Sequence, residues 1–207
     1  VDYFPFIILL WGLFTVSGGI LLRGTLAGNP ATNTILILIG TALASWMGTT
    51  GAAMLMIRPI IRANEKRKYK VHTIVFFIFL VANIGGSLTA LGDPPLFLGF
   101  LNGVPFFWTM NLFPHMIFMV VCLIIIYFLM DNILYKKEGK LPATEEKEPF
   151  KLEGLHNFLL LGGLLGAVII SGSWKPGDID ILGVHVQLQN LARDGVIILM
   201  GILSLIT

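Results

Sequence analysis

The chain has 207 residues and a formal net charge of +2, and it is 56% hydrophobic but 13% charged. A soluble domain carries about 25% charged residues. Here the charges lie in short clusters between long apolar runs, so the pattern excludes an ordinary soluble domain and predicts an all-α, polytopic protein of the lipid bilayer. The single cysteine, Cys122, excludes a disulfide or a cysteine-based metal site within one chain.

Residues 1–32 are expected to form one membrane-spanning helix followed by a polar loop. The apolar run from Phe4 to Leu22 is long enough to cross a hydrocarbon core about 30 Å thick, and Arg23 ends it. The chain starts close to this span and stops inside another apolar run, so we expect a fragment of a longer protein.

Residues 33–63 contain GTTG, residues 48–51, near the centre of an apolar stretch. One interpretation is a single long tilted helix. The other is a re-entrant hairpin whose two half-helices meet at GTTG, which a membrane tolerates only where protein or a water-filled cavity surrounds the non-helical backbone. A hairpin places Arg23 on the same side of the membrane as Arg62, so the positive-inside rule favours it.

Two basic segments define the expected cytoplasmic side. The first is residues 62–72, whose basic side chains are Arg62, Lys66, Arg67, Lys68 and Lys70. The second is the lysine-rich segment 135–154. Between them, residues 71–107 are too many for one straight crossing and fit one crossing with an unwound middle. Residues 116–134 and 155–172 read as simple apolar spans.

Residues 83–95 read NIGGSLTALGDPP, which a continuous membrane helix does not accommodate. The glycines release the backbone from helical geometry, and Pro94 biases Asp93 away from the helical region. Opened carbonyls and helix ends at mid-membrane can hold an ion, and an ionisable residue at that depth marks a functional site. We expect Asp93, Ser87 and Thr89 to bind sodium, with a proton as the competing ion at Asp93. The alternative is a proline kink with Asp93 facing water in the bundle.

Other polar residues in the apolar runs carry two interpretations each. Thr49 and Thr50 can serve helix packing alone, but a second broken segment in the same chain favours a site built from paired discontinuous helices. Arg58 either pairs with Asp93 or an anionic substrate, or extends to the cytoplasmic surface. His115 is expected to cap a helix at the membrane interface rather than to relay protons.

The remaining titratable residues form no catalytic or metal-binding pattern. Asp131 is expected at the cytoplasmic interface, and His72, His156 and His185 share no metal-ligand spacing. We therefore expect no enzyme and no cofactor beyond sodium or protons as coupling ions. Topology explains the basic residues at 62–70 more simply than nucleic-acid binding does.

The stretch NIGGSLTALGDPP resembles the IGG-x-x-T-x-x-G-[DS]-PP signature of the ion transporter superfamily, which includes divalent-anion/sodium symporters, citrate-type carriers, arsenite-type pumps and some sodium/proton antiporters. In that superfamily the signature lies on a broken transmembrane helix beside the substrate and sodium site. GTTGAAMLMIRP is similar to the tip and descending arm of the preceding re-entrant hairpin. The run from GTTG to GVPFFW looks closest to a bacterial branch labelled sodium/proton antiporter or "putative citrate transporter".

The resemblance implies the N-terminal half of an inverted-repeat transporter in the bacterial inner membrane. It implies transport-domain elements over 33–110, namely the hairpin 33–63 and the broken helix 71–107. Scaffold spans are implied over 1–32 and 111–172, and 173–207 would hold an extracytoplasmic loop and the start of a further span. Relatives dimerise through the scaffold, so a homodimer is expected. The implied ion- or substrate-binding positions are Gly48, Thr49, Thr50, Gly51, Asn83, Gly85, Gly86, Ser87, Thr89, Gly92, Asp93, Pro94 and Pro95.

Two departures from the superfamily pattern affect which solute the protein is expected to transport. GTTG stands where carboxylate carriers have Ser-Asn-Thr, and Asp93 stands where sodium/dicarboxylate carriers often have a small neutral residue. A fixed carboxylate favours sodium/proton antiport, which is the predicted function. One alternative is cation-coupled transport of citrate or another carboxylate held by Thr49 and Thr50. Another is a membrane assembly protein that transports nothing.

Overall fold

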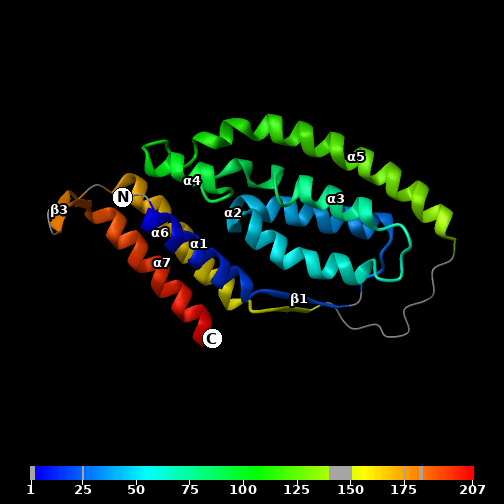
Figure 1. Ribbon diagram of the computed structural model, residues 1–207, viewed down its shortest axis with the longest axis horizontal. Coiled ribbons are helices and arrows are strands. Elements are labelled where there is room, and N and C mark those ends of the chain that lie inside the picture. The colour runs from blue at the N-terminus through cyan, green and yellow to red at the C-terminus, as the bar shows by residue number, and fades with distance from the viewer. Residues whose placement is uncertain (1–2, 25, 140–150, 175, 182–183) are drawn as a thin grey trace.

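A computed structural model describes residues 3–24, 26–139, 151–174, 176–181 and 184–207. Helices dominate the described residues, and the strands are short (Figure 1). The elements in chain order are α1 (Tyr3–Gly18), β1 (Leu21–Arg23), α2 (Pro30–Ala63), α3 (Val71–Leu80), the 3₁₀ helix η1 (Ile84–Leu88), α4 (Pro94–Leu101), the 3₁₀ helix η2 (Trp108–Leu112), α5 (Phe113–Glu138), β2 (Lys151–Glu153), α6 (His156–Ser173), β3 (Asp178–Ile181), β4 (Val184–Gln187) and α7 (Leu188–Ile206).

The chain is an all-α polytopic membrane protein, as its composition predicts. Five helical segments are long and apolar enough to cross a membrane, and α1 is a shorter apolar helix. The five segments are Pro30–Ala63, Val71–Leu88, Trp108–Glu138, His156–Ser173 and Leu188–Ile206. Helix α2 meets the length and hydropathy criteria for a membrane span, but its chain reverses direction midway. It is therefore not a simple crossing.

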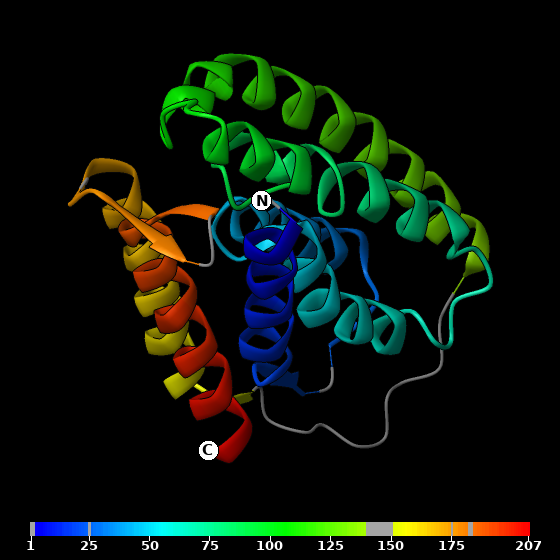
Figure 2. The ribbon, with the colours of Figure 1, turned by 60° about the vertical axis from the view of Figure 1, so that its left-hand side comes forward.

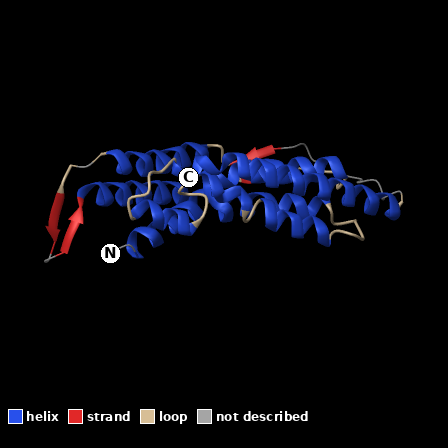
Figure 3. Cartoon of the chain, turned by 90° about the horizontal axis from the view of Figure 1, so that it is seen from above, coloured by secondary structure: helices blue, strands red, loops and turns tan. Residues whose placement is uncertain are grey.

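The helices pack as two groups that meet at α1 (Figures 1 and 2). Helices α1, α6 and α7 pack together, and α2, α3, η1 and α5 form the second group. Helix α1 also contacts α2 and α4. Seen from above, the molecule is a thin layer with the β3–β4 hairpin at one end (Figure 3). In the most apolar 18-residue stretch of each segment, 61% of Pro30–Ala63 is buried against 17% of Trp108–Glu138, so the hairpin is the better-enclosed element.

Helix α2 is two antiparallel arms. Gly48 has φ 78° and ψ 152°, a conformation that side-chain-bearing residues rarely adopt, and it interrupts the helix. At the base of the arms, the side-chain amides of Asn33 and Asn64 donate to each other at 2.8 Å in both directions. The chain therefore forms a hairpin with its tip at GTTG, and Figure 1 shows the two arms side by side.

The pairing of β1 with β2 agrees with the hairpin topology. In this antiparallel ladder Arg23 is the register partner of Lys151, which directly follows the lysine-rich segment. Arg23 therefore lies at the same end of the molecule as Lys151, as a hairpin requires and a single crossing does not. Residues 140–150 of the expected cytoplasmic loop lie outside the described residues.

The expected unwound crossing over 71–107 is also broken. Helix α3 ends at Leu80, η1 follows, and α4 begins at Pro94. Thr89 and Asp93 are extended, with φ/ψ of −135°/161° and −145°/142°. The glycines and prolines explain this locally, because they favour non-helical backbone and remove amide donors.

Two sequence-based expectations about elements differ from the structure. The first helix ends at Gly18 rather than at Leu22, and the chain beyond it enters β1. The loop after α6 contains the β3–β4 hairpin, for which the alternating residues of DIDI and VHVQ were a signal. Helix α5, expected as a scaffold span, packs on α2, α3 and η1. The assignment of helices to a scaffold and a transport domain stays a prediction.

Candidate functional site

The hairpin tip and the broken crossing are joined by polar bonds at three points. The amide of Thr49 donates to the carbonyl oxygen of Gly92 at 2.9 Å. The hydroxyl of Ser45 donates to the carbonyl oxygen of Gly85 at 2.5 Å, and the hydroxyl of Thr89 donates to the carbonyl oxygen of Ser45. These bonds satisfy backbone groups that the two breaks remove from helical ladders.

Glycines allow this close approach. A Cβ on Gly86 would lie 2.6 Å from both the carbonyl oxygen of Gly92 and Cγ2 of Thr49, and a Cβ on Gly92 would overlap the carbonyl oxygen of Gly86. A Cβ on Gly85 would lie 2.7 Å from the carbonyl oxygen of Thr41. Gly85, Gly86 and Gly92 are therefore required by packing between the hairpin and the broken crossing.

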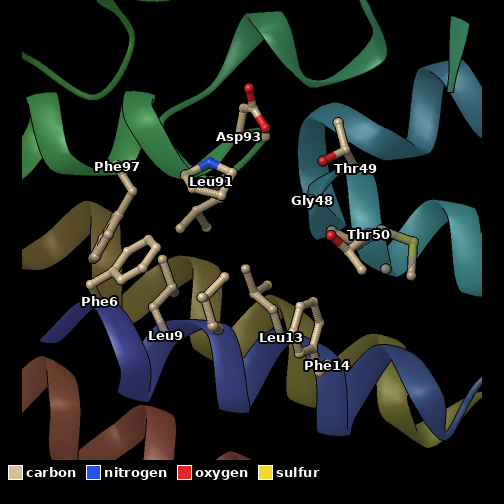
Figure 4. A pocket seen from close by; sticks show the side chains of 15 residues that line it. Phe6, Leu9, Leu13, Phe14, Gly48, Thr49, Thr50, Leu91, Asp93 and Phe97 are labelled. Atoms are coloured by element: carbon tan, nitrogen blue, oxygen red, sulfur yellow. The ribbon is translucent and has the colours of Figure 1, made fainter. Parts of the chain in front are cut away.

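A first cavity lies between α1, the hairpin tip and the start of α4 (Figure 4). Its volume is about 20 Å³, measured as the space open to the centre of a water-sized sphere, so it is small. In Figure 4, Thr49 and Thr50 lie on one side, the apolar side chains of α1 below, and Asp93 above. Its lining includes seven of the predicted positions, namely Gly48, Thr49, Thr50, Gly51, Gly92, Asp93 and Pro94.

A second cavity, with a volume of about 360 Å³ by the same measure, lies between the broken crossing and α5. The predicted positions in its lining are Asn83, Gly86, Ser87, Asp93 and Pro95. The hydroxyl oxygen of Ser87 is buried and has no hydrogen-bond partner. A buried hydroxyl without a partner is unfavourable unless water or an ion completes its coordination.

Asp93 lines both cavities. It is half-buried at the N-terminus of α4, and its side chain does not cap that helix. Its carboxyl group makes no hydrogen bond or ion pair with another described residue. The site therefore holds a carboxylate without a counter-charge, which is free to bind a cation or a proton.

A family model described as "Putative citrate transport" matches residues 1–207. The chain belongs to this family. No curated protein and no solved structure matches it. Membership supports a transport role for this family member and does not identify the ion that drives it.

In this member of the citrate transport family, two predicted residues lie outside both cavities. Thr89 donates to the hairpin and accepts a 3.3 Å bond from the amide of Leu91, so its hydroxyl holds the loop in shape. Gly85 serves packing. The sodium-ligand role of Thr89 stays a prediction, and the geometry supplies a structural role beside it.

Two residues with alternative interpretations are placed by the structure. Arg58 is exposed, lines neither cavity and forms no ion pair with a described residue, as expected of a side chain that extends to the surface. His115, expected as a cap, is exposed and lines the second cavity. Its side chain makes no hydrogen bond to a described residue.

Sequence reasoning missed several polar residues of this transporter. Ser45, three residues before Gly48, is a buried polar side chain in an apolar arm, which was a usable signal. Asp131 was expected at the interface, yet its side chain is 0% exposed and pairs with Arg67 and His72. Its partners come from distant segments, so nothing in the local pattern showed this pairing.

Helix α7 holds a further buried charge that the sequence reading passed over. Arg193 is buried, with its Nε 2.8 Å from Oδ1 of Asp194 and its guanidinium 5.6 Å over the ring of Phe97. It lines a third cavity, with a volume of about 590 Å³, between the α4–η2 loop and α6 and α7. Phe97 lines the first cavity, so it lies between that cavity and Arg193.

Proposed function

We propose that the protein is a secondary transporter of the bacterial inner membrane that exchanges sodium for protons at Asp93. The observation that carries the proposal is the carboxylate of Asp93 at a helix break, between two cavities, without a counter-charge. A carboxylate at membrane depth is costly unless it binds a cation or a proton. Family membership supports transport, and the ion is our inference.

The chemistry of the exchange follows from one carboxylate with one charge. A proton forms an O–H bond at the carboxyl group, whereas sodium is held by its charge together with neutral oxygens. The Ser87 hydroxyl and the backbone carbonyls of the break are available for this. Because the same oxygens bind either ion, occupancy by one excludes the other. Movement of the loaded site between the two membrane faces then couples the two gradients.

Cation-coupled transport of citrate or another carboxylate is the second candidate, and the family description favours it. No Lys, Arg or His lines the first cavity among the described residues, so that cavity suits a cation better than a citrate anion. Arg193, in the third cavity, is the buried cationic group that a carboxylate would seek. A homodimer through α1 and its neighbours stays part of the proposal for either solute.

The test is reconstitution of the full-length protein in proteoliposomes. Internal pH is followed after a sodium pulse for wild type, Asp93→Asn and the control Asp178→Asn, whose side chain is exposed on β3. A sodium-driven pH change that Asp93→Asn abolishes and Asp178→Asn retains supports antiport. Sodium-stimulated uptake of labelled citrate without a pH change overturns antiport and supports the second candidate. If the folded protein shows neither a sodium-driven pH change nor citrate uptake, that result supports an assembly role.

A further inference from the structure

A buried ionic cluster lies at the base of the hairpin, away from the tip. At its centre is Asp131 on α5, whose Oδ1 lies 2.6 Å from Nη1 of Arg67 and 2.8 Å from Nε2 of His72. Its Oδ2 accepts hydrogen bonds of 3.3 Å from Asn33 and from Tyr127. Both oxygens of this carboxylate accept hydrogen bonds or ion pairs from protein groups, so its negative charge is balanced by neighbouring donors.

Arg67 joins this cluster to the rest of the hairpin base. Its Nη1 donates to the carbonyl oxygen of Gly28 at 3.3 Å and to Oδ1 of Asn64 at 3.5 Å. Its Nε donates to Glu138 at 3.1 Å, and its guanidinium lies 5.3 Å over the ring of Tyr135. Arg67 therefore connects the end of the second hairpin arm to two further positions on α5.

The cluster holds both arms at once. Asn33 lies in the first turn of the first arm, Asn64 follows the second arm, and their side-chain amides pair with each other. Asp131 binds the first member of this amide pair and Arg67 the second. Removal of either charge would take from the other its closest buried partner and leave Arg67 with Glu138 alone, or Asp131 with His72 alone, which is unfavourable.

The opposite side of the hairpin has no comparable attachment. Where α1 meets the tip, the lining side chains Leu9, Leu13 and Phe14 are apolar, and among the described residues no hydrogen bond joins α1 to α2. Apolar contact is non-directional and tolerates sliding. The polar attachments of the hairpin are therefore the cluster at its base on the α5 side and the three bonds between its tip and the broken crossing.

We propose that Asp131 and Arg67 are positioning residues for the ion site, because their ion pair orients the hairpin on α5 and so sets where the tip meets Gly92 and Asp93. The proposal rests on cation binding at Asp93. From Asn33 to Gly48 the first arm is about 22 Å long. A tilt of about 5° at its base displaces the tip by about 2 Å, enough to break the 2.9 Å bond from Thr49 to Gly92.

The first test separates affinity from the amount of folded protein. Sodium dependence of transport is measured per mole of folded protein for Asp131→Asn and Arg67→Gln, with Arg62→Gln as the matched control because Arg62 is exposed on the last turn of α2. We expect the apparent KM for sodium to rise by about 3- to 30-fold in the two cluster variants. An unchanged KM with less folded protein shows a merely structural role and overturns the proposal.

Two further variants keep the test decisive. Asp131→Glu retains the charge and is expected to recover most of the wild-type KM. If the single variants fail to fold, the triple variant Arg67→Met, Asp131→Leu and Glu138→Gln removes all three charges, which buried ionic clusters tolerate better than the loss of one partner. We expect a raised KM in this folded variant, and a wild-type KM overturns the proposal.

A second readout does not depend on transport. Thr50→Cys, in a Cys122→Ser background, places a thiol at the exposed tip position that lines the first cavity. We expect Asp131→Asn to change the rate of thiol labelling at this site, and Arg62→Gln to leave it unchanged. If Asp131→Asn changes the labelling rate but the wild type transports nothing, tip positioning holds and the proposed function fails. If the labelling rate is unchanged but the wild type transports sodium, the proposed function holds and tip positioning fails.

Discussion

The backbone amide of Thr49 donates a 2.9 Å hydrogen bond to the carbonyl oxygen of Gly92, which joins the tip of the hairpin to the residue before Asp93. The two residues come from separate breaks in the helical chain. Each break exposes backbone groups that need partners, and each supplies what the other lacks. The position of Asp93 between two cavities therefore depends on the contact between the two breaks and not on either break alone.

Ser87 and Ser17 allow a matched test of ion coordination. Both hydroxyl oxygens are buried without a hydrogen-bond partner. Ser87 lines the cavity beside Asp93, whereas Ser17 lies on α1 against Gly51. We expect Ser87→Ala to raise the apparent KM for sodium and Ser17→Ala to leave it unchanged, with little loss of stability in either because no bond is lost. Equal effects of the two variants on KM would remove Ser87 from the site.

Gly92→Ala tests the close approach of the breaks. The added Cβ would overlap the carbonyl oxygen of Gly86, and backbone on both sides leaves it no flexible neighbour to displace. We expect the free energy of unfolding to fall by about 3 kcal/mol, at the upper end of ordinary overpacking. Thermal unfolding in detergent measures this. Gly162→Ala is the control, because a Cβ there has nothing within 4 Å.

Competition at Asp93 predicts a pH dependence of sodium affinity. As pH falls, the proton occupies the carboxyl group more often, so sodium must displace it. The apparent KM for sodium should rise by up to about tenfold per pH unit where the protonated form dominates. Initial rates of sodium uptake at several pH values test this in proteoliposomes. A KM independent of pH would show that the two ions do not share Asp93.

Asp131→Asn should be costly in stability. It leaves the buried guanidinium of Arg67 without its closest partner, at a side-chain exposure of 1%, so we expect a loss of about 3–5 kcal/mol in the free energy of unfolding. The triple variant that removes the charges of Arg67, Asp131 and Glu138 together should lose much less. Chemical denaturation of the purified variants compares them. A triple variant less stable than Asp131→Asn would contradict this account.

Arg58→Gln should change little. The side chain is exposed and pairs with no described residue, so the free energy of unfolding should move by less than about 0.5 kcal/mol. Transport should keep its wild-type KM for sodium and for citrate. A KM that rises for citrate but not for sodium would support the interpretation that Arg58 contacts an anionic substrate.

Local backbone chemistry made the breaks predictable. Gly48 lies in a cluster of small residues, and Pro94 follows Asp93, so the positions where helices stop could be placed from adjacent residues. The cluster around Asp131 could not be placed in this way. Its partner Arg67 looks like one of several basic residues in a cytoplasmic loop, and only packing of α5 on the hairpin selects it. The end of α1 coincides with Gly18 and Gly19, which is a local signal, whereas the pairing of β1 with β2 is a contact between distant segments.

Hydropathy, glycines, prolines and charge act over a few neighbouring residues, so the sequence was enough to predict an all-α membrane protein with a break at residues 83–95 that carries a carboxylate, while it left the break at GTTG as one of two interpretations. The tertiary structure alone decided that the breaks meet through Thr49 and Gly92, that Asp93 faces two cavities, and that Asp131 is buried against Arg67. Those relations depend on which helices pack together. Packing is a sum of many weak contacts between distant residues, and no single stretch of sequence contains that sum.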